Sequence, residues 1–241
     1  MLDLTLFFQP AASIHAPEGA LYHHIHFSPE SSEEIERNSI CVFHVNEYRG
    51  RGEENQPMLD FRSTAYSLFP GQDWNMKIYD LGDMNPGATP EDTYFAVQTV
   101  VAELIKNNCI PLLIGGSMDL LHAISVGYEV TEQLINICAI DERISLGKPD
   151  EDISSDGYLS SLLLRRPCYL FNHATIGLQP NRNNPMNLDL YDKLYFDVCR
   201  LGAFNTDFKV AEPILRNSDI IGMNLEALKA SERMMDKANP N

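Results

Sequence analysis

The sequence lacks the features that mark membrane, secreted and nucleic-acid-binding proteins. It contains no apolar run of about 18 residues, the length that a transmembrane helix needs. Residues 1–4 lack the basic segment and long apolar core of a signal peptide. The chain has 18 Lys and Arg against 34 Asp and Glu, a formal net charge of −16, and its cations do not cluster. Because phosphate-following and lipid-binding surfaces need clustered cations, we expect neither nucleic acid nor membrane as a partner.

Cysteine is also sparse, and its spacing excludes the common metal and redox motifs. There are 5 cysteines, they lie far apart, and no CxxC pair occurs. Four of the five lie in or beside apolar runs; the cysteines are Cys41, Cys109, Cys138, Cys168 and Cys199. We interpret them as buried, reduced thiols of a cytoplasmic protein.

Hydrophobic residues make up 44% of the 241 residues, enough for one α/β domain of ordinary size or two small ones. Short apolar runs, typical of strands buried on both faces, occur at 39–45, 76–81, 110–114, 134–140, 168–171 and 219–225. Amphipathic segments separate several of them, and the clearest begins at Thr89-Pro90-Glu91-Asp92, with a cap, a proline and two acids in order. This alternation predicts a three-layer αβα fold with a mostly parallel sheet.

Other segments are less regular. Residues 1–38 are interpreted as an N-terminal extension of uncertain structure, and 39–241 as one α/β domain. The polar stretch 172–187 is predicted to be a loop, and 191–198 is ambiguous between helix and strand. Residues 206–216 are predicted to be a helix that bends or restarts at Pro213.

Polar groups follow three of the predicted strands. They are Gly115-Gly116-Ser117-Met118-Asp119, Asp141-Glu142-Arg143-Ile144-Ser145 and Gly222-Met223-Asn224-Leu225-Glu226. Open α/β sheets place their sites at the carboxyl ends of strands. In order and spacing the segments resemble the GGDHS, DAHxD and SxDxD motifs of the ureohydrolase superfamily of arginases, agmatinases and formimidoylglutamases. The resemblance is greatest to the formimidoylglutamase-like branch and extends over about residues 39–235, since 46–52, 61–62 and 212–219 are similar as well.

Members of that superfamily bind two manganese ions through these motifs, but this sequence departs from the pattern at each one. Met118 and Arg143 replace the two histidines, and Ser145 replaces an aspartate. Asn224 and Glu226 replace two further aspartates, while Asp141 is retained. Two neighbouring dications need several anions to offset their repulsion, and an arginine adds positive charge. If the segment is extended, Arg143 lies on the same face as Asp141 and can pair with it. Asp119 is interpreted as a helix N-cap rather than a substitute ligand.

Two functions follow from the resemblance. The first is a ureohydrolase-like protein without metal or catalysis, a pseudoenzyme that binds a small polar or anionic ligand or acts as a regulatory or scaffold protein. The second is a divergent hydrolase of non-peptide C–N bonds that uses an altered one-metal site, with manganese as the metal, or no metal, with His122 or His173 as base. The site candidates are Met118, Asp119, Asp141, Arg143, Ser145, His173, Asn224 and Glu226. The resemblance also implies a homo-oligomer. Ureohydrolases continue past the third motif into a last strand near the centre of the sheet, so either this sequence is a fragment, or its sheet is rearranged, or another chain fills the gap. An unfilled gap leaves two strand edges open.

Overall fold

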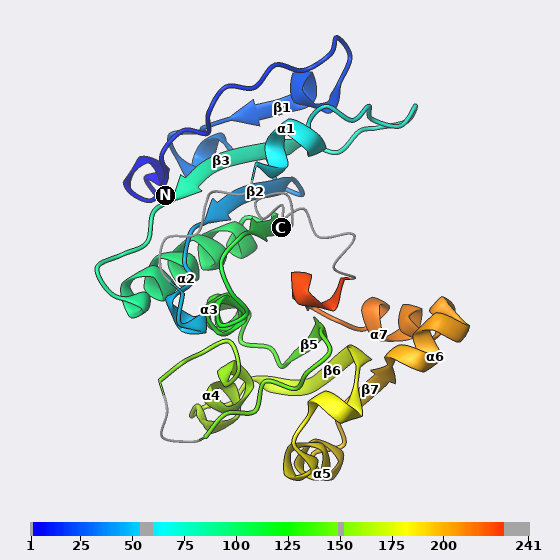
Figure 1. The fold of residues 1–241 in the computed structure, drawn as a ribbon. Coiled ribbons are helices and arrows are strands. Elements are labelled where there is room, and N and C mark those ends of the chain that lie inside the picture. Colours follow the sequence, from blue (N-terminus) through cyan, green and yellow to red (C-terminus); the bar gives the residue numbers. More distant parts are fainter. Residues whose placement is uncertain (1, 54–59, 149–151, 229–241) are drawn as a thin grey trace, which may run out of the picture. The chain divides into compact units, whose positions relative to one another are not determined.

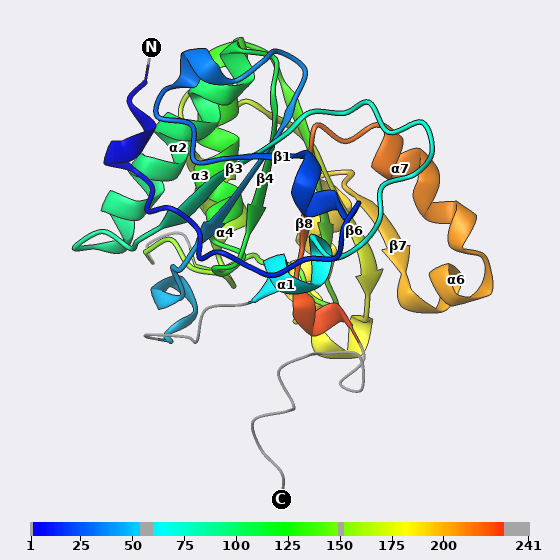
Figure 2. The same ribbon diagram turned by 90° about the horizontal axis from the view of Figure 1, so that it is seen from above.

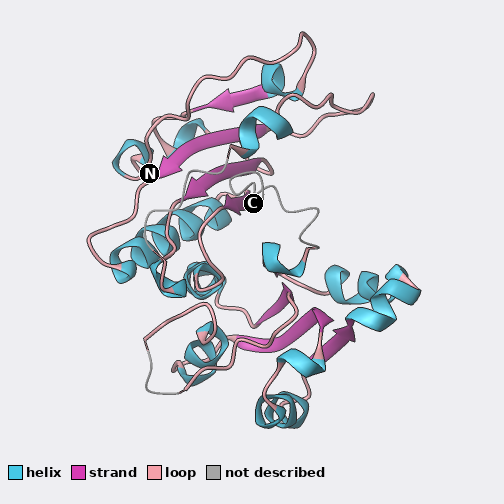
Figure 3. Ribbon diagram, viewed as in Figure 1, coloured by secondary structure: helices cyan, strands magenta, loops and turns pink. Residues whose placement is uncertain are grey.

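The computed structural model describes residues 2–53, 60–148 and 152–228, and the chain divides into two compact units, Met1–Thr131 and Glu132–Asn241. Figures 1 and 2 show the elements of each unit in two views, and Figure 3 separates helices from strands. In the described part of the chain, no helix combines the length and the apolar character needed to cross a bilayer.

The first unit is built on a parallel sheet with the strand order β1-β3-β2-β4 in its described residues. The strands are β1 (Ile25–Phe27), β2 (Ile40–Val45), β3 (Ile78–Met84) and β4 (Ile110–Ile114). The α-helices are α1 (Phe61–Ala65), α2 (Pro90–Lys106) and α3 (Leu120–Tyr128), with 3₁₀ helices η1 (Leu4–Leu6), η2 (Leu21–His24), η3 (Ser32–Glu34), η4 (Arg49–Arg51) and η5 (Glu129–Thr131). Residues 1–38 therefore contribute β1 to this sheet.

Helix α2 begins where the sequence predicts. Thr89 and Asp92 form a reciprocal capping box, with Pro90 in the first turn. The buried stripe of α2 includes Val97, Val100, Val101 and Leu104. Gly127 of α3 lies against this stripe, because a Cβ there would come within 2.8 Å of the Val101 side chain. The small residue thus allows α3 to pack closely on α2 (Figure 1).

The second unit has its own parallel sheet, with the order β7-β6-β5-β8 among the described residues. The strands are β5 (Ile135–Ile140), β6 (Leu170–Leu178), β7 (Asp197–Arg200) and β8 (Ile220–Met223). The helices are α4 (Tyr158–Leu164), α5 (Pro185–Lys193), α6 (Leu201–Thr206) and α7 (Glu212–Arg216), with η6 (Pro180–Arg182), η7 (Phe208–Ala211) and η8 (Leu225–Ala227).

Helices cover both faces of this second sheet. On one face, Cys138, Ala174 and Ile176 pack with Phe204 of α6 and Ile214 of α7. On the other, His173 and Thr175 of β6 face Tyr158 of α4 and Tyr191 of α5. The described fold is therefore α/β with helices on both sides of parallel strands, as the sequence predicts.

The prediction of a loop over 172–187 is wrong. Strand β6 continues to Leu178, and α5 begins at Pro185, capped by the Asn184 side chain. His173 and Thr175 are polar, so this part of the strand has the sequence pattern of a loop. Both side chains are nevertheless buried, because a tyrosine hydroxyl forms hydrogen bonds with them inside the core. The ambiguous stretch 191–198 contains the end of α5 and the start of β7. The segment 206–216 is not one helix, but its last part does restart at Pro213 in α7.

Candidate functional site at the strand ends

The carboxyl ends of β5 and β8 place Asp141 beside Asn224 in the second unit. The two strands are neighbours, with Ile140 paired to Met223, so the residues that follow them meet. Asn224 Nδ2 donates to Asp141 Oδ2 at 2.8 Å, and its backbone N–H donates to the Ile140 carbonyl at 3.0 Å. The sequence therefore identified two of its candidates as neighbours.

Both oxygens of the Asp141 carboxylate accept hydrogen bonds. The backbone N–H of Arg143 donates to Oδ1 at 3.1 Å, while Asn224 uses Oδ2. The residue is 4% exposed, and burial raises the pKa of its carboxyl although the hydrogen bond from Asn224 opposes that shift. One N–H donor on each oxygen therefore holds this buried carboxylate in place.

The prediction that the Arg143 side chain pairs with Asp141 is wrong. The guanidinium points to its neighbour, with Nε 3.6 Å from Glu142 Oε1, and the side chain is 48% exposed. Arg182 Nη1 lies 2.6 Å from the same carboxylate oxygen. The premise of an extended segment fails, because the chain bends at 141–143 and turns Arg143 away.

The two remaining candidates near these strand ends have local structural contacts. The Ser145 residue is 8% exposed, and its carbonyl accepts the Leu159 N–H at 3.2 Å, which ties the loop to α4. The Glu226 N–H donates to Asn224 Oδ1 at 3.0 Å and begins η8. Asn224 thus uses both ends of its carboxamide.

His173 lies inside β6 rather than after a strand. Tyr158 Oη is 3.1 Å from Nε2, and Tyr191 Oη is 2.7 Å from Nδ1. The residue is 1% exposed, and burial lowers the pKa of the imidazole to about 3. A neutral ring with both nitrogens engaged is a poor general base.

In the first unit, the two glycines after β4 allow the turn that leads to Met118 and Asp119. Gly115 and Gly116 have φ angles of +92° and +67°, which favour glycine. Met118 is half-buried and Asp119 is fully buried. His122, the other candidate base, is 5% exposed in the first turn of α3.

Asp119 stands at the N-cap position of α3, as predicted, but the expected capping by its side chain does not occur. Its backbone is already helical, at φ −60° and ψ −25°, and its carboxylate makes no capping hydrogen bond. Instead the Tyr94 hydroxyl donates to Oδ2 at 2.7 Å, and the Ser117 hydroxyl donates to Oδ1. Burial and the adjacent Asp119 carboxylate raise the pKa of the Tyr94 phenol.

Sequence reasoning missed a buried ionic cluster in the first unit. Arg62 of α1 donates to Asp80 Oδ2 at 2.6 Å and to Asp83 Oδ1 at 2.7 Å. The Tyr66 hydroxyl donates to Asp80 Oδ2 at 2.6 Å, and His44 Nδ1 lies 3.5 Å from Asp83 Oδ1. A signal was present, because two acids at a predicted strand end require a buried cation.

Within the described ranges, no three His, Cys, Asp or Glu side chains form a group able to hold a metal ion. In the second unit, the hydrogen bonds of the motif residues explain why they do not form a metal site. Of the motif residues in the second unit, Asp141 accepts two N–H groups, and Asn224 presents its amide nitrogen to that carboxylate. Hard divalent cations prefer oxygen ligands, so this arrangement does not fit manganese.

The fold is shared with solved structures of formiminoglutamases and arginase-like proteins. The model matches a formiminoglutamase from Trypanosoma cruzi, solved with Mn²⁺, at a TM-score of 0.73 and 16% identity, over 90% of this chain and 78% of that one. It matches a formimidoylglutamase from Bacillus subtilis at a TM-score of 0.72 and 13% identity, over 95% and 77%. The chain has an arginase-like fold. No protein-family model and no curated protein sequence matches it.

A third neighbour with this arginase-like fold is an arginase-like protein from T. brucei, solved as a quadruple mutant. It matches at a TM-score of 0.61 and 13% identity, over 87% of this chain and 72% of that one. Four residues are replaced in that mutant. The first three are a serine, an arginine and a serine at intervals of two residues, and they become aspartate, histidine and aspartate in that order. The fourth, a serine later in the sequence, becomes aspartate.

Proposed function

We propose that this chain is a divergent ureohydrolase-like protein of the formimidoylglutamase type that has lost the dimanganese site and acts as a non-catalytic binding, regulatory or scaffold protein. The arginase-like fold supports the relationship. The single observation that carries the loss of the metal is the hydrogen bond from Asn224 Nδ2 to Asp141 Oδ2 at 2.8 Å.

That hydrogen bond stands where the superfamily pattern has two carboxylates. In the superfamily pattern the position of Asn224 holds an aspartate, and a pair of carboxylates can share a dication. Here the amide donates to Asp141 instead, so the two side chains satisfy each other without a cation. Burial also raises the pKa of Asp141, which favours its uncharged form.

The arginase-like protein of T. brucei supports the same proposal. The serine, arginine and serine replaced in its mutant have the spacing of Asp141, Arg143 and Ser145 in this chain, and the arginine and second serine are the same residue types. This chain therefore shares a departure from the histidine and aspartate pattern with a protein of the same fold. The half-exposed guanidinium of Arg143 gives the loop a positive group for a small polar or anionic ligand.

The decisive measurement is the manganese content of the purified protein after incubation with Mn²⁺ and gel filtration, together with the shift in Tm. We expect no bound manganese and no shift. A ligand that binds only the folded state at 100 times its Kd adds about 2.7 kcal/mol to the unfolding free energy, so a genuine site raises Tm. Near-stoichiometric manganese with a raised Tm would overturn the proposal and favour the divergent hydrolase.

A matched variant makes a negative result informative. We expect Arg143→His, Ser145→Asp, Asn224→Asp and Glu226→Asp, introduced together at the strand ends of the second unit, to restore manganese binding. Both proteins should be assayed for hydrolysis of arginine, agmatine and formimidoylglutamate. Turnover by the unmodified chain would contradict the pseudoenzyme interpretation whatever its metal content.

A further inference from the structure

A cavity of about 490 Å³ lies at the amino ends of the strands in the second unit. It is lined by Asn136 near the start of β5, Asn172 near the start of β6 and Asp197 at the start of β7. Asn217 precedes β8 and completes the polar lining from that side. Since the strands are parallel, this cavity lies at the end of the sheet opposite to Asp141 and Asn224.

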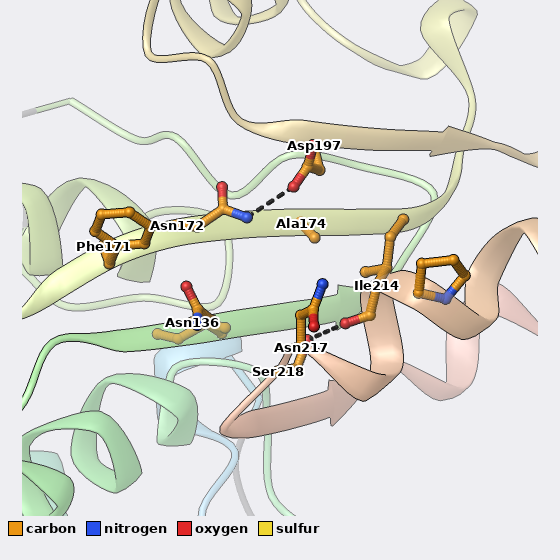
Figure 4. A pocket seen from close by; sticks show the side chains of 10 residues that line it. Asn136, Phe171, Asn172, Ala174, Asp197, Ile214, Asn217 and Ser218 are labelled. Atoms are coloured by element: carbon orange, nitrogen blue, oxygen red, sulfur yellow. Dashed lines mark hydrogen bonds between the residues drawn. The ribbon is translucent and has the colours of Figure 1, made fainter.

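The cavity has an acidic and an apolar component. Figure 4 shows the Asn172–Asp197 pair on one side and Asn136 and Asn217 on the other, with Ile214 at one end. Phe171 and Ile214 supply apolar surface, while three carboxamides and one carboxylate supply polar groups. Ligand sites typically combine an apolar lining with a few such converging polar groups.

The negative charge in the cavity lining favours a positively charged ligand. Among the described residues that line the cavity there is no Lys, Arg or His, so Asp197, which is exposed, is the one charged side chain in this lining. Asn172 Nδ2 donates to Asp197 Oδ2 at 2.7 Å, which orients the carboxylate and leaves acceptor positions on it. A cationic donor gains a charge-assisted hydrogen bond there, whereas an anion is repelled.

We propose that this cavity binds a small alkylamine with a hydrogen-bonding group at its far end. The ammonium contacts Asp197, the methylene chain lies along Ile214, and the far group reaches the carboxamides of Asn136 and Asn217. The proposal does not depend on the state of the strand-end site, because none of its residues belongs to that site.

The test uses three probes that share one carbon chain and differ in charge: 4-amino-1-butanol, 1,4-butanediol and 4-hydroxybutanoate. Each is titrated into the ¹⁵N-labelled full chain while the side-chain amide signals are followed by NMR. We expect saturable shifts of the Asn136, Asn172 and Asn217 amides with the amine, binding about tenfold tighter than the diol, and none with the anion. Equal binding of diol and amine, or amide signals that do not move, would overturn the proposal.

Two isosteric variants separate the site from general charge effects. Asp197→Asn keeps an oxygen that accepts from Asn172 but removes the charge, so the preference for the amine over the diol should disappear. Asp189→Asn on α5 removes the same charge from an exposed position outside the lining and should preserve that preference. An unchanged preference in the folded Asp197→Asn protein, or an equal loss in both variants, would contradict a specific cation site.

Discussion

At the scale of single residues, Arg62 shows how much one buried cation can support. Its guanidinium neutralises Asp80 and Asp83, and the side chain is 7% exposed. We expect Arg62→Met to lower the unfolding free energy by about 3–5 kcal/mol, because two buried carboxylates lose their partner. Urea unfolding of the first unit, followed by the fluorescence of Trp74, measures this. Lys77→Met in the same unit, on a side chain that is 48% exposed, should cost less than about 1 kcal/mol.

Tyr191 is the corresponding residue in the second unit. Its hydroxyl contacts His173 Nδ1, the Thr175 hydroxyl and the His173 carbonyl. Removing it in Tyr191→Phe leaves these buried groups without a partner, so we expect a loss of about 1–3 kcal/mol. Tyr195→Phe is a matched control, since Tyr195 is 91% exposed, and hydrogen exchange in β6 should be unaffected by it. Equal losses in the two variants would show that the network contributes nothing.

At the scale of elements, the loop after β2 approaches the start of α3 closely because Gly50 has no side chain. A Cβ at Gly50 would lie within 2.3 Å of the Asp119 carboxylate, which Tyr94 holds in place. We expect Gly50→Ala to destabilise the first unit by about 1–3 kcal/mol through overpacking. Gly71→Ala should be close to neutral, because nothing lies within 4 Å of a Cβ there. Comparing urea midpoints of the two variants tests this.

The sequence predicted elements well where the local signal is strong. The apolar run of β4 and the capping box of α2 both form at the predicted places. The predicted burial of β4 on both faces is wrong, because Ile110 is 55% exposed and Leu112 is 46% exposed. The sequence prediction also failed at β6, where polar side chains are buried, and at Asp119, whose carboxylate is directed by a tyrosine 25 positions earlier in the sequence. Such partners come from tertiary structure, and no local pattern contains them.

At the scale of the whole molecule, the order of motifs along the chain identified the fold, although identity to the matched structures is only 13–16%. Alternating β and α elements with right-handed crossovers restrict the topology strongly, so strand-end segments fall at predictable places. The hydrogen bonds within the candidate site could not be predicted in the same way. That Asn224 donates to Asp141 while Arg143 turns to Glu142 depends on side-chain directions, which a motif does not specify.

The response of the second unit to pH follows from one buried ring. The pKa of His173 falls from 6.5 to about 3 on folding. Below about pH 6.5 the unfolded chain therefore binds a proton that the folded chain does not, and stability falls as pH decreases. The raised pKa of Asp141 changes stability with pH in the opposite direction. That contribution is the same in the unsubstituted chain and in a His173→Gln variant, so it cancels when the two are compared.

We therefore expect the destabilisation caused by His173→Gln to shrink by about 2 kcal/mol between pH 7 and pH 5, because only the unsubstituted chain loses stability through this proton. The reason is that glutamine cannot take up the proton in either state. Hydrogen exchange of amides in β5 and β6, corrected for intrinsic rates, measures the second unit alone, since the only Trp, Trp74, lies in the first. A difference between the two proteins that is constant across this range would mean that His173 becomes charged in the folded state, and the tyrosine network would then have to be reinterpreted as a proton-binding site.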